Sequence, residues 1–200
     1  MMIFLNLRDR PVVVVGGGEV AERRIEAVAE AGARVTVVSP EITARIGQWV
    51  AAGRVRLERR RYRVGDLRGA RLAYVATGDA DANRAAREEA DAEGVLLNVA
   101  DEPALCDFLT PASVRRGDLT VGISTSGASP ALAARLRERL ERDLGPEYAA
   151  LVQQLRDLRV RCRAEGRPLS EARAEMERLI DEVLPRSQAL LRPRPRPRRS

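Results

Sequence analysis

The sequence predicts an α/β protein built on a doubly wound parallel β-sheet. Short apolar runs, several of them rich in β-branched residues, alternate with amphipathic stretches of helical length, which is typical of repeated βαβ units. The first such run, residues 12–15, leads into three consecutive glycines and then directly into a helical pattern. Polar residues follow four of the runs, where the carboxyl edge of a parallel sheet binds ligands.

Composition sets the broad class of the protein. The 200 residues are 44% hydrophobic and carry a formal net charge of +6, and no apolar run reaches the roughly 18–20 residues of a membrane span. No signal peptide is evident, and Cys106 and Cys162 form no C-x-x-C motif, so we expect a soluble protein of the reducing cytoplasm. Because histidine is absent, acid–base or metal chemistry falls to carboxylates, hydroxyls or thiols.

Arginine supplies the positive charge, and part of it lies in residues 192–200, where arginine alternates with proline. Such a segment is expected to be extended and disordered. A solvated tail is the simpler interpretation, and binding to nucleic acid is the alternative.

The glycine cluster predicts a dinucleotide site of the Rossmann type. In the pattern G-x-G-x-x-A, Gly16 allows the turn, Gly18 lets the backbone approach a pyrophosphate, and Ala21 lets helix and strand pack closely. The helix amides and dipole then face an anion. A glycine-rich turn without a ligand is the alternative interpretation.

The next elements complete this half of the chain. We expect a helix over residues 19–31, ending at Gly32, and a strand over residues 34–38. An NAD-binding strand tip normally carries a carboxylate for the ribose, but here Ser39 stands there with Glu41 two places on, which leaves NAD and NADP both open.

Three further strands are predicted at residues 54–58, 72–76 and 95–99, with helices at 41–52 and 80–93. Residues 59–63 are strongly basic, and they are either a solvated loop or part of a site for a polyanion. The predicted ligand-binding edge therefore comprises the polar segments at Gly16–Gly18, Ser39, Thr77–Asp79 and Asn98–Asp101.

The second half begins with a strand over residues 119–123, followed by a serine-rich segment and a helix to residue 144, with Ser129 as its N-cap and Pro130 in its first turn. Two amphipathic helices are expected at 147–165 and 170–184. Their apolar residues predict a small core or a partner-binding face.

Three segments resemble the precorrin-2 dehydrogenase and sirohydrochlorin ferrochelatase family, which makes sirohaem. They are GGGEVAERR at 16–24, NVADEPALCDF at 98–108 and STSGASPALAAR at 124–135. The resemblance implies an NAD-binding domain over 1–112, a dimerisation segment over 113–145, a helical domain over 146–185, and a tail over 186–200. It also implies a homodimer that oxidises precorrin-2, a tetrapyrrole with eight carboxylates, to sirohydrochlorin with transfer of a hydride to NAD.

The resemblance further assigns roles to particular residues. Asp101 matches the family's functional aspartate and is the expected acid–base group; if the chain also inserts ferrous iron, Asp101 would hold the metal transiently. A turn-forming role is the alternative for Asp101, and Asp107 and Glu102 are its substitutes. The expected NAD contacts are Gly16, Gly18, Glu19, Val20, Ser39, Pro40, Glu41 and Thr77. The expected substrate contacts are Asn98, Ser124, Thr125, Ser126 and Ser129.

Other functions remain open at this stage. Some relatives only dehydrogenate, and others carry a phosphorylatable serine at the position of Thr125. Cys106 is either a metal-contacting thiol or a buried structural one. The alternative from another class is a dinucleotide-sensing regulator whose basic tail binds nucleic acid, although no helix-turn-helix supports it.

Overall fold

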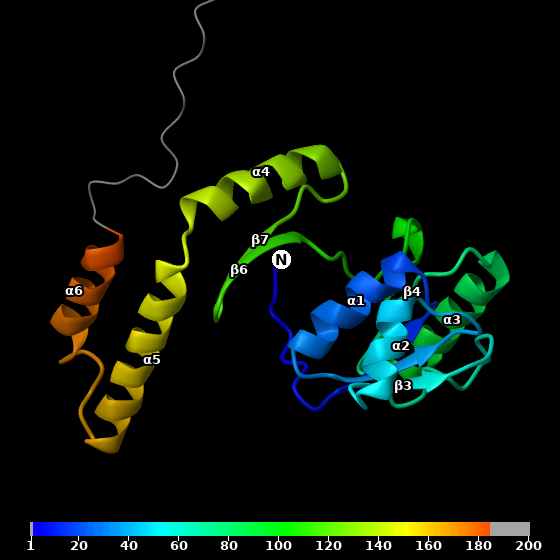
Figure 1. Ribbon diagram of the computed structural model, residues 1–200, viewed down its shortest axis with the longest axis horizontal. Coiled ribbons are helices and arrows are strands. Elements are labelled where there is room, and N and C mark those ends of the chain that lie inside the picture. The colour runs from blue at the N-terminus through cyan, green and yellow to red at the C-terminus, as the bar shows by residue number, and fades with distance from the viewer. Residues whose placement is uncertain (1, 185–200) are drawn as a thin grey trace, which may run out of the picture. The chain divides into compact units, whose positions relative to one another are not determined.

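The computed structural model describes residues 2–184 (Figure 1). The chain divides into two compact units, Met1–Leu109 and Thr110–Ser200. The predicted tail over 186–200 lies outside the described residues. No helix in the described part of the chain is long and apolar enough to cross a membrane.

Five parallel strands form the sheet of the first unit, in the order β3-β2-β1-β4-β5. They are β1 (Pro11–Val15), β2 (Arg34–Val38), β3 (Val55–Glu58), β4 (Leu72–Val75) and β5 (Leu96–Val99). The chain builds outward from β1 through β2 to β3, and then returns to the other side of β1 with β4. This reversal of direction opens a crevice beyond the carboxyl ends of β1 and β4, where ligands bind in sheets of this kind.

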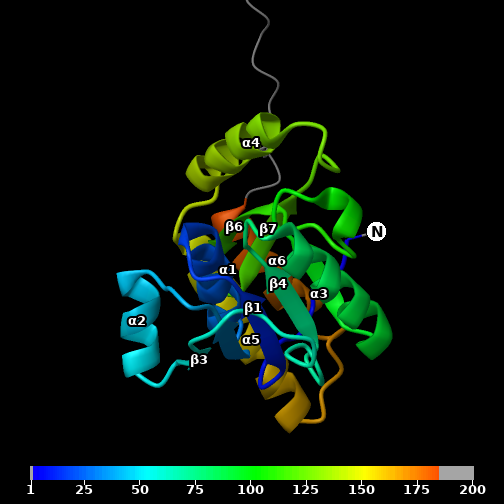
Figure 2. The ribbon, with the colours of Figure 1, turned by 90° about the vertical axis from the view of Figure 1, so that its right-hand side faces the viewer.

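Helices cover both faces of the sheet, which confirms the doubly wound prediction (Figure 2). Val12 and Val14 share one apolar cluster with buried residues of α1 (Glu19–Glu30) and α2 (Ala44–Ala51). Val13 and Val15 belong to a second cluster with α3 (Ala80–Glu93). Side chains of a strand alternate between its two faces, so a continuous valine run is what a strand buried on both sides requires.

Helix α2 begins three residues later than the sequence predicted, at Ala44 instead of residue 41. Thr43 has extended backbone geometry, and its hydroxyl accepts a hydrogen bond from the Ile46 amide at 3.2 Å. The same hydroxyl donates to Glu22 of α1 at 2.6 Å. Thr43 is therefore the N-cap, and its link to α1 holds residues 41–43 in the loop that follows β2.

The second unit contains a hairpin of β6 (Ala112–Arg116) and β7 (Leu119–Ile123), followed by three helices. These helices are α4 (Pro130–Asp143), α5 (Glu147–Ala164) and α6 (Arg173–Val183). The sequence did not predict strand β6, because its segment ASVRR does not alternate regularly between apolar and polar residues. The strand forms by pairing with β7, and Gly117, at φ +57°, lies in the turn between the two strands. The helix predicted from residue 170 begins only at Arg173, since backbone turns occupy the residues after Pro168.

Candidate functional site

The glycine turn after β1 is shaped by close backbone packing. A Cβ on Gly16, whose φ is +114°, would lie 2.3 Å from the Ala76 carbonyl oxygen, and one on Gly17 would lie 2.0 Å from that of Glu41. A Cβ on Gly18 would meet nothing within 4 Å. Gly16 and Gly17 therefore let the turn fold, whereas Gly18 faces the open space that a pyrophosphate needs.

The N-terminus of α1 is ready to receive an anion. Gly18 is its N-cap and supplies no side-chain hydrogen bond to the first turn, which contains the predicted residues Glu19 and Val20. Ala21 is fully buried, as its predicted packing role requires. Uncapped amides at a helix N-terminus attract negative charge. These features fit the phosphates of a dinucleotide.

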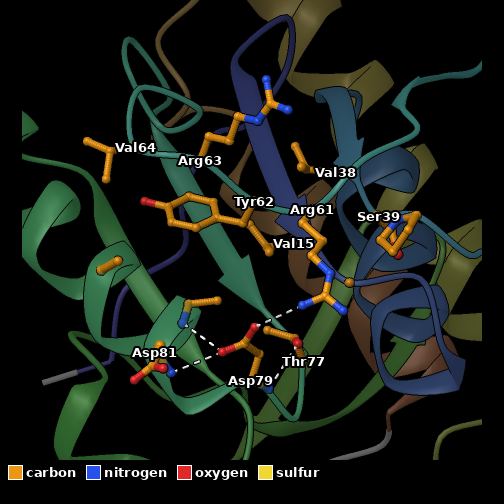
Figure 3. Close-up of a pocket in the computed structure, with 14 residues that line it drawn as sticks. Val15, Val38, Ser39, Arg61, Tyr62, Arg63, Val64, Thr77, Asp79 and Asp81 are labelled. Carbon is orange, nitrogen blue, oxygen red and sulfur yellow. Dashed lines mark hydrogen bonds and ion pairs between the residues drawn. The ribbon is translucent and has the colours of Figure 1, made fainter.

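A cavity of about 490 Å³ opens beside this turn at the carboxyl edge of the sheet (Figure 3). Four predicted cofactor residues line it: Gly16, Ser39, Pro40 and Thr77. The structure brings these residues together from the ends of β1, β2 and β4. Glu19, Val20, Glu41 and Gly18 are not among the residues that line the cavity.

Ser39 does not offer a free hydroxyl at the tip of β2. Its side chain is 6% exposed and donates to the Glu41 carbonyl at 2.6 Å. The hydroxyl therefore fixes the turn after β2, while the Glu41 carboxylate is on an exposed residue. Neither group places a carboxylate in the cavity wall at this strand tip.

The basic segment after β3 lines the same cavity. Arg61, Tyr62, Arg63 and Val64 all contribute to the wall. Arg61 extends across to Asp79, the N-cap of α3, with 3.9 Å between the charged groups (Figure 3). Of the two interpretations of residues 59–63, the structure favours part of a ligand site for Arg61 and Arg63.

Two buried or partly buried carboxylates hold this basic segment in place. Asp66 accepts two hydrogen bonds from the Arg60 guanidinium, at 2.8 and 2.7 Å, and one from the Arg63 amide at 2.9 Å. Glu89 of α3 accepts from the Tyr62 hydroxyl and from the Leu67 amide. Burial, the Glu89 hydrogen bond and the Glu89 charge raise the pKa of the Tyr62 phenol, so the hydroxyl stays a donor.

The Asp66 anchor predicts a specific dependence of stability on pH. Burial alone would raise the pKa of Asp66, but hydrogen bonds and charges from Arg60 and Arg63 outweigh it and hold the pKa below its usual 3.8. Since the pKa is lower in the folded state, the carboxylate stabilises the fold above about pH 4, and this contribution is lost as the pH falls through the folded value. We expect the difference in unfolding free energy between the native chain and Asp66→Asn, measured in urea, to be constant above pH 5 and to shrink at lower pH. A pH-independent difference would contradict this.

Asp101 lies in the turn directly after β5, with an exposed side chain and a φ of +61°. This left-handed conformation is uncommon for residues other than glycine, although aspartate can adopt it through local hydrogen bonds. Residues in such strained conformations cluster at functional sites. The preceding Ala100 amide bonds to the Val75 carbonyl at 2.8 Å, which places the turn beside the end of β4. Asp101 does not line the cavity described above.

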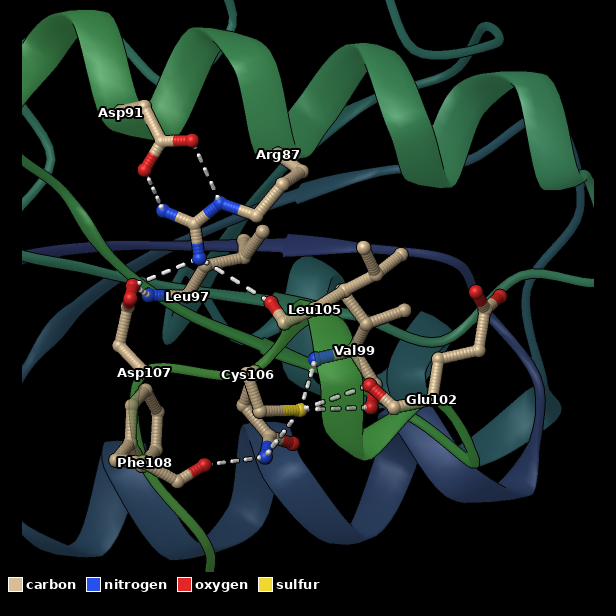
Figure 4. A network of polar contacts seen from close by, with 10 residues as sticks. Arg87, Asp91, Leu97, Val99, Glu102, Leu105, Cys106, Asp107 and Phe108 are labelled. Carbon is tan, nitrogen blue, oxygen red and sulfur yellow. Dashed lines mark hydrogen bonds and ion pairs between the residues drawn. The ribbon is translucent and has the colours of Figure 1, made fainter.

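A network of polar contacts fastens this turn to the open edge of β5 (Figure 4). The Cys106 sulfur accepts from the Val99 amide at 3.2 Å, and Asp107 accepts from the Leu97 amide at 2.8 Å and from Arg87 at 2.9 Å. Side chains thus satisfy the backbone groups that an edge strand leaves unpaired. The structure gives Cys106 the structural role of the two considered from the sequence.

The side chains of Asn98, Asp107 and Glu102 form hydrogen bonds within the protein. Asn98 was expected to bind substrate, but it is 6% exposed and its amide donates to the Phe108 carbonyl at 2.8 Å. Glu102 accepts from Asn83 of α3 at 2.6 Å. Among the described residues, Asp101 takes no part in this network, and its side chain is exposed.

The Cys106 anchor yields a prediction about activity. Cys106→Ala leaves the Val99 amide without its acceptor, which we expect to lower stability by about 1–3 kcal/mol. Since the turn that carries Asp101 loses the hydrogen bond between Val99 and Cys106, the kcat should fall while the KM for NAD stays unchanged. Cys106→Ser retains a hydroxyl acceptor and should recover part of both losses, measured by denaturant unfolding and steady-state kinetics. Equal kcat values for the alanine variant and the native chain would argue against this role.

The predicted substrate-binding hydroxyls lie in the loop between β7 and α4. Ser129 caps α4 by accepting from the Leu132 amide at 3.2 Å, as the sequence predicted. Thr125 accepts from the Ser129 amide at 3.0 Å, and Ser124 from the Ser126 amide at 3.1 Å. Ser126 has a φ of +51°. These bonds preshape the loop, and Ser124 and Ser126 remain exposed.

Comparison with known proteins identifies the family. Residues 3–112 match the family described as "Putative NAD(P)-binding", and residues 116–143 match "Sirohaem biosynthesis protein central". The solved structure of SirC, a precorrin-2 dehydrogenase, is 33% identical with a TM-score of 0.78, and the match covers 91% of this chain and 90% of that one. The chain belongs to the precorrin-2 dehydrogenase family.

Curated members related to this family are longer than this chain. A siroheme synthase of Methylobacillus flagellatus is 44% identical over 149 residues, which are 74% of this chain and 32% of that protein. One from Methylococcus capsulatus is 42% identical over 161 residues, 80% of this chain and 34% of that protein. The chain therefore spans about a third of the length of these relatives. Membership confirms the resemblance seen in the sequence and identifies the first unit as an NAD(P)-binding domain.

Proposed function

We propose that this chain catalyses the NAD-dependent oxidation of precorrin-2 to sirohydrochlorin. The observation that carries the proposal is the carboxyl edge of the sheet, where the open glycine turn and the Asp101 turn follow β1 and β5. These strands flank β4, and each turn contacts its end: Gly16 packs against the Ala76 carbonyl, and Ala100 bonds to Val75. The family supports this assignment.

The residues of the chain would share the work in a defined way. When bound, the nicotinamide cofactor accepts the hydride in this type of reaction. The Gly18 backbone and the uncapped first turn of α1 hold the negatively charged phosphates. The Asp101 carboxylate accepts the proton that leaves the substrate, a role open to it because the chain has no histidine. The hydroxyls of Ser124, Thr125, Ser126 and Ser129 bind the carboxylates of the substrate.

The test follows absorbance of the reduced nicotinamide when the chain is mixed with precorrin-2. Runs with NAD and with NADP establish the preference, since no carboxylate from the β2 tip stands in the cavity wall. Absorbance that rises with either nucleotide supports the proposal. No increase with either nucleotide, from a chain shown to be folded, would exclude it.

We also propose ferrochelation as a second step, with ferrous iron and sirohydrochlorin as its substrates and Asp101 as the proton acceptor. Metal binding requires that the pyrrole nitrogens lose their protons, which a nearby carboxylate can take. An insertion assay with ferrous iron, followed by the visible spectrum of the macrocycle, tests this step. Dehydrogenation without insertion would identify the chain as a dehydrogenase only.

We further propose that the chain acts in the reducing cytoplasm, where thiols such as those of Cys106 and Cys162 stay free.

We propose that residues 113–145 form the dimerisation segment and that 146–185 form the helical domain. Helix α4 exposes Leu132 and Leu136, at 50% and 37% exposure, one turn apart on the same face. An apolar stripe of this kind is typical of an interaction face. A homodimer would cover it with a second copy of the chain.

The dimer makes a direct prediction about mass in solution. Leu132→Asp with Leu136→Asp buries carboxylates in the proposed interface, so we expect a dimer to become a monomer in sedimentation velocity. Ile3→Asp alters a leucine-sized exposed side chain outside the segment and should leave the dimer intact. If both proteins sediment as the native chain does, α4 is not the interface.

A further inference from the structure

Helix α5 carries a groove of about 620 Å³ that no step of the proposed reaction uses. Its residues recur at intervals of one turn along the helix and continue into the loop that follows. Its apolar floor includes Val152, Leu155, Val160 and Leu169, of which Val160 is 63% exposed and Leu169 is 40% exposed. The adjacent side of α5 is buried through Leu158 and Cys162. The groove is thus an exposed, partly apolar face of a helix that is already packed along its neighbouring side.

Four arginines border this floor: Arg156, Arg159, Arg163 and Arg167. Arg156 pairs with Asp118, and Arg167 lies 3.6 and 3.8 Å from two glutamates. Arg159 and Arg163 have no ion pair within the described residues, although they stand one turn apart. Like charges at this spacing destabilise a helix. Their two uncompensated charges beside exposed valine and leucine suit a ligand that is both polyanionic and partly apolar.

A second copy of this chain fits the groove poorly. A two-fold axis through this face would bring the same arginines of both copies together, and the chain already carries a net charge of +6. A ligand with carboxylates around an apolar ring complements the groove in both charge and polarity. The substrate and product of the proposed function have this chemistry, and the inference rests on that function in naming them.

We propose that the α5 groove is a further binding site for a polycarboxylate tetrapyrrole, built from side chains of the second unit that the proposed reaction does not use. The apolar floor packs against the macrocycle, and the guanidinium groups of Arg159 and Arg163 bind its carboxylates in charge-assisted hydrogen bonds. Such a site would retain substrate or product on the C-terminal unit.

Uroporphyrin, a stable porphyrin with eight carboxylates, is the probe. Its binding to the full chain is followed by porphyrin fluorescence, and stoichiometry is measured by equilibrium dialysis. In Arg159→Ala with Arg163→Ala, we expect the dissociation constant of the groove to rise at least tenfold and one bound porphyrin per chain to be lost. Arg161→Ala with Arg173→Ala removes the same charge from exposed arginines of α5 and α6 that do not line the groove, and should bind as the native chain does.

The outcomes separate this site from the proposed function. If the native chain forms no reduced nicotinamide but binds uroporphyrin through Arg159 and Arg163, the groove stands and the proposed oxidation fails. If the native chain is active and both double variants bind uroporphyrin equally, the groove proposal is wrong. The proposal would also be overturned if a dicarboxylate porphyrin bound the groove more tightly than uroporphyrin. The same holds if an acidic peptide or a single-stranded RNA displaced uroporphyrin at a concentration below that of the porphyrin, because the groove would then belong to another ligand.

Discussion

Asp101→Asn is expected to lower the rate of nicotinamide reduction by about 100- to 10,000-fold, the usual contribution of a general acid–base group. Asparagine has the same shape and tolerates the left-handed conformation at φ +61°, so the turn should be kept. The loss should therefore appear in kcat, with little change in the KM for NAD. Steady-state absorbance kinetics with precorrin-2 measure both constants.

Asp9 offers a matched control for this variant. It is also an exposed aspartate in a turn, with a φ of +57°, but it precedes β1 at the opposite end of that strand from the glycine turn. We expect Asp9→Asn to retain the native kcat. If Asp101→Asn remained fully active, Asp101 would be a turn-forming residue and the proton would need another acceptor.

Two neighbouring glycines are expected to fail in different ways. In Gly17→Ala the new methyl group would lie 2.0 Å from the Glu41 carbonyl oxygen, so backbone must move. We expect a loss of about 1–3 kcal/mol of stability, as in other overpacked interiors, and a lower melting temperature. In Gly18→Ala the methyl group meets no protein atom within 4 Å, and φ −82° suits alanine.

Gly18→Ala should therefore keep the native melting temperature and instead raise the KM for NAD by roughly tenfold, or about 1.4 kcal/mol of binding. The methyl group would occupy the space through which the backbone approaches the phosphates. Calorimetry measures the melting temperature of each variant, and titration with NAD measures its affinity for the cofactor. Each glycine variant serves as the control for the other. Unchanged NAD affinity in Gly18→Ala would place the pyrophosphate elsewhere.

The sequence by itself determined the parallel sheet, its strand positions within one or two residues, and the family. These features are local in the sequence: a valine run indicates a strand buried on both faces, and Gly16, Gly18 and Ala21 stand together in one short strand-turn-helix pattern. Helix ends were predicted well where a cap is a nearest neighbour, as at Asp79 and Ser129. The start of α2 was not, because its cap Thr43 is held by Glu22 from another helix.

Only the tertiary structure decided which polar side chains are free to bind ligands. Asn98 and Ser39 look like site residues in the sequence, yet both turn inward to backbone carbonyls, while Arg61 reaches the cavity because the loop before β4 is fastened to Glu89. The partners of Asn98 and Leu67 lie 10 and 22 residues away in the chain, and even the bond from Ser39 to the nearby Glu41 depends on a backbone conformation that the residue pattern does not specify. A hydroxyl or amide that already has a hydrogen-bond partner inside the fold is not available to a ligand. Packing therefore decides which polar side chains at the edge of the sheet can bind one.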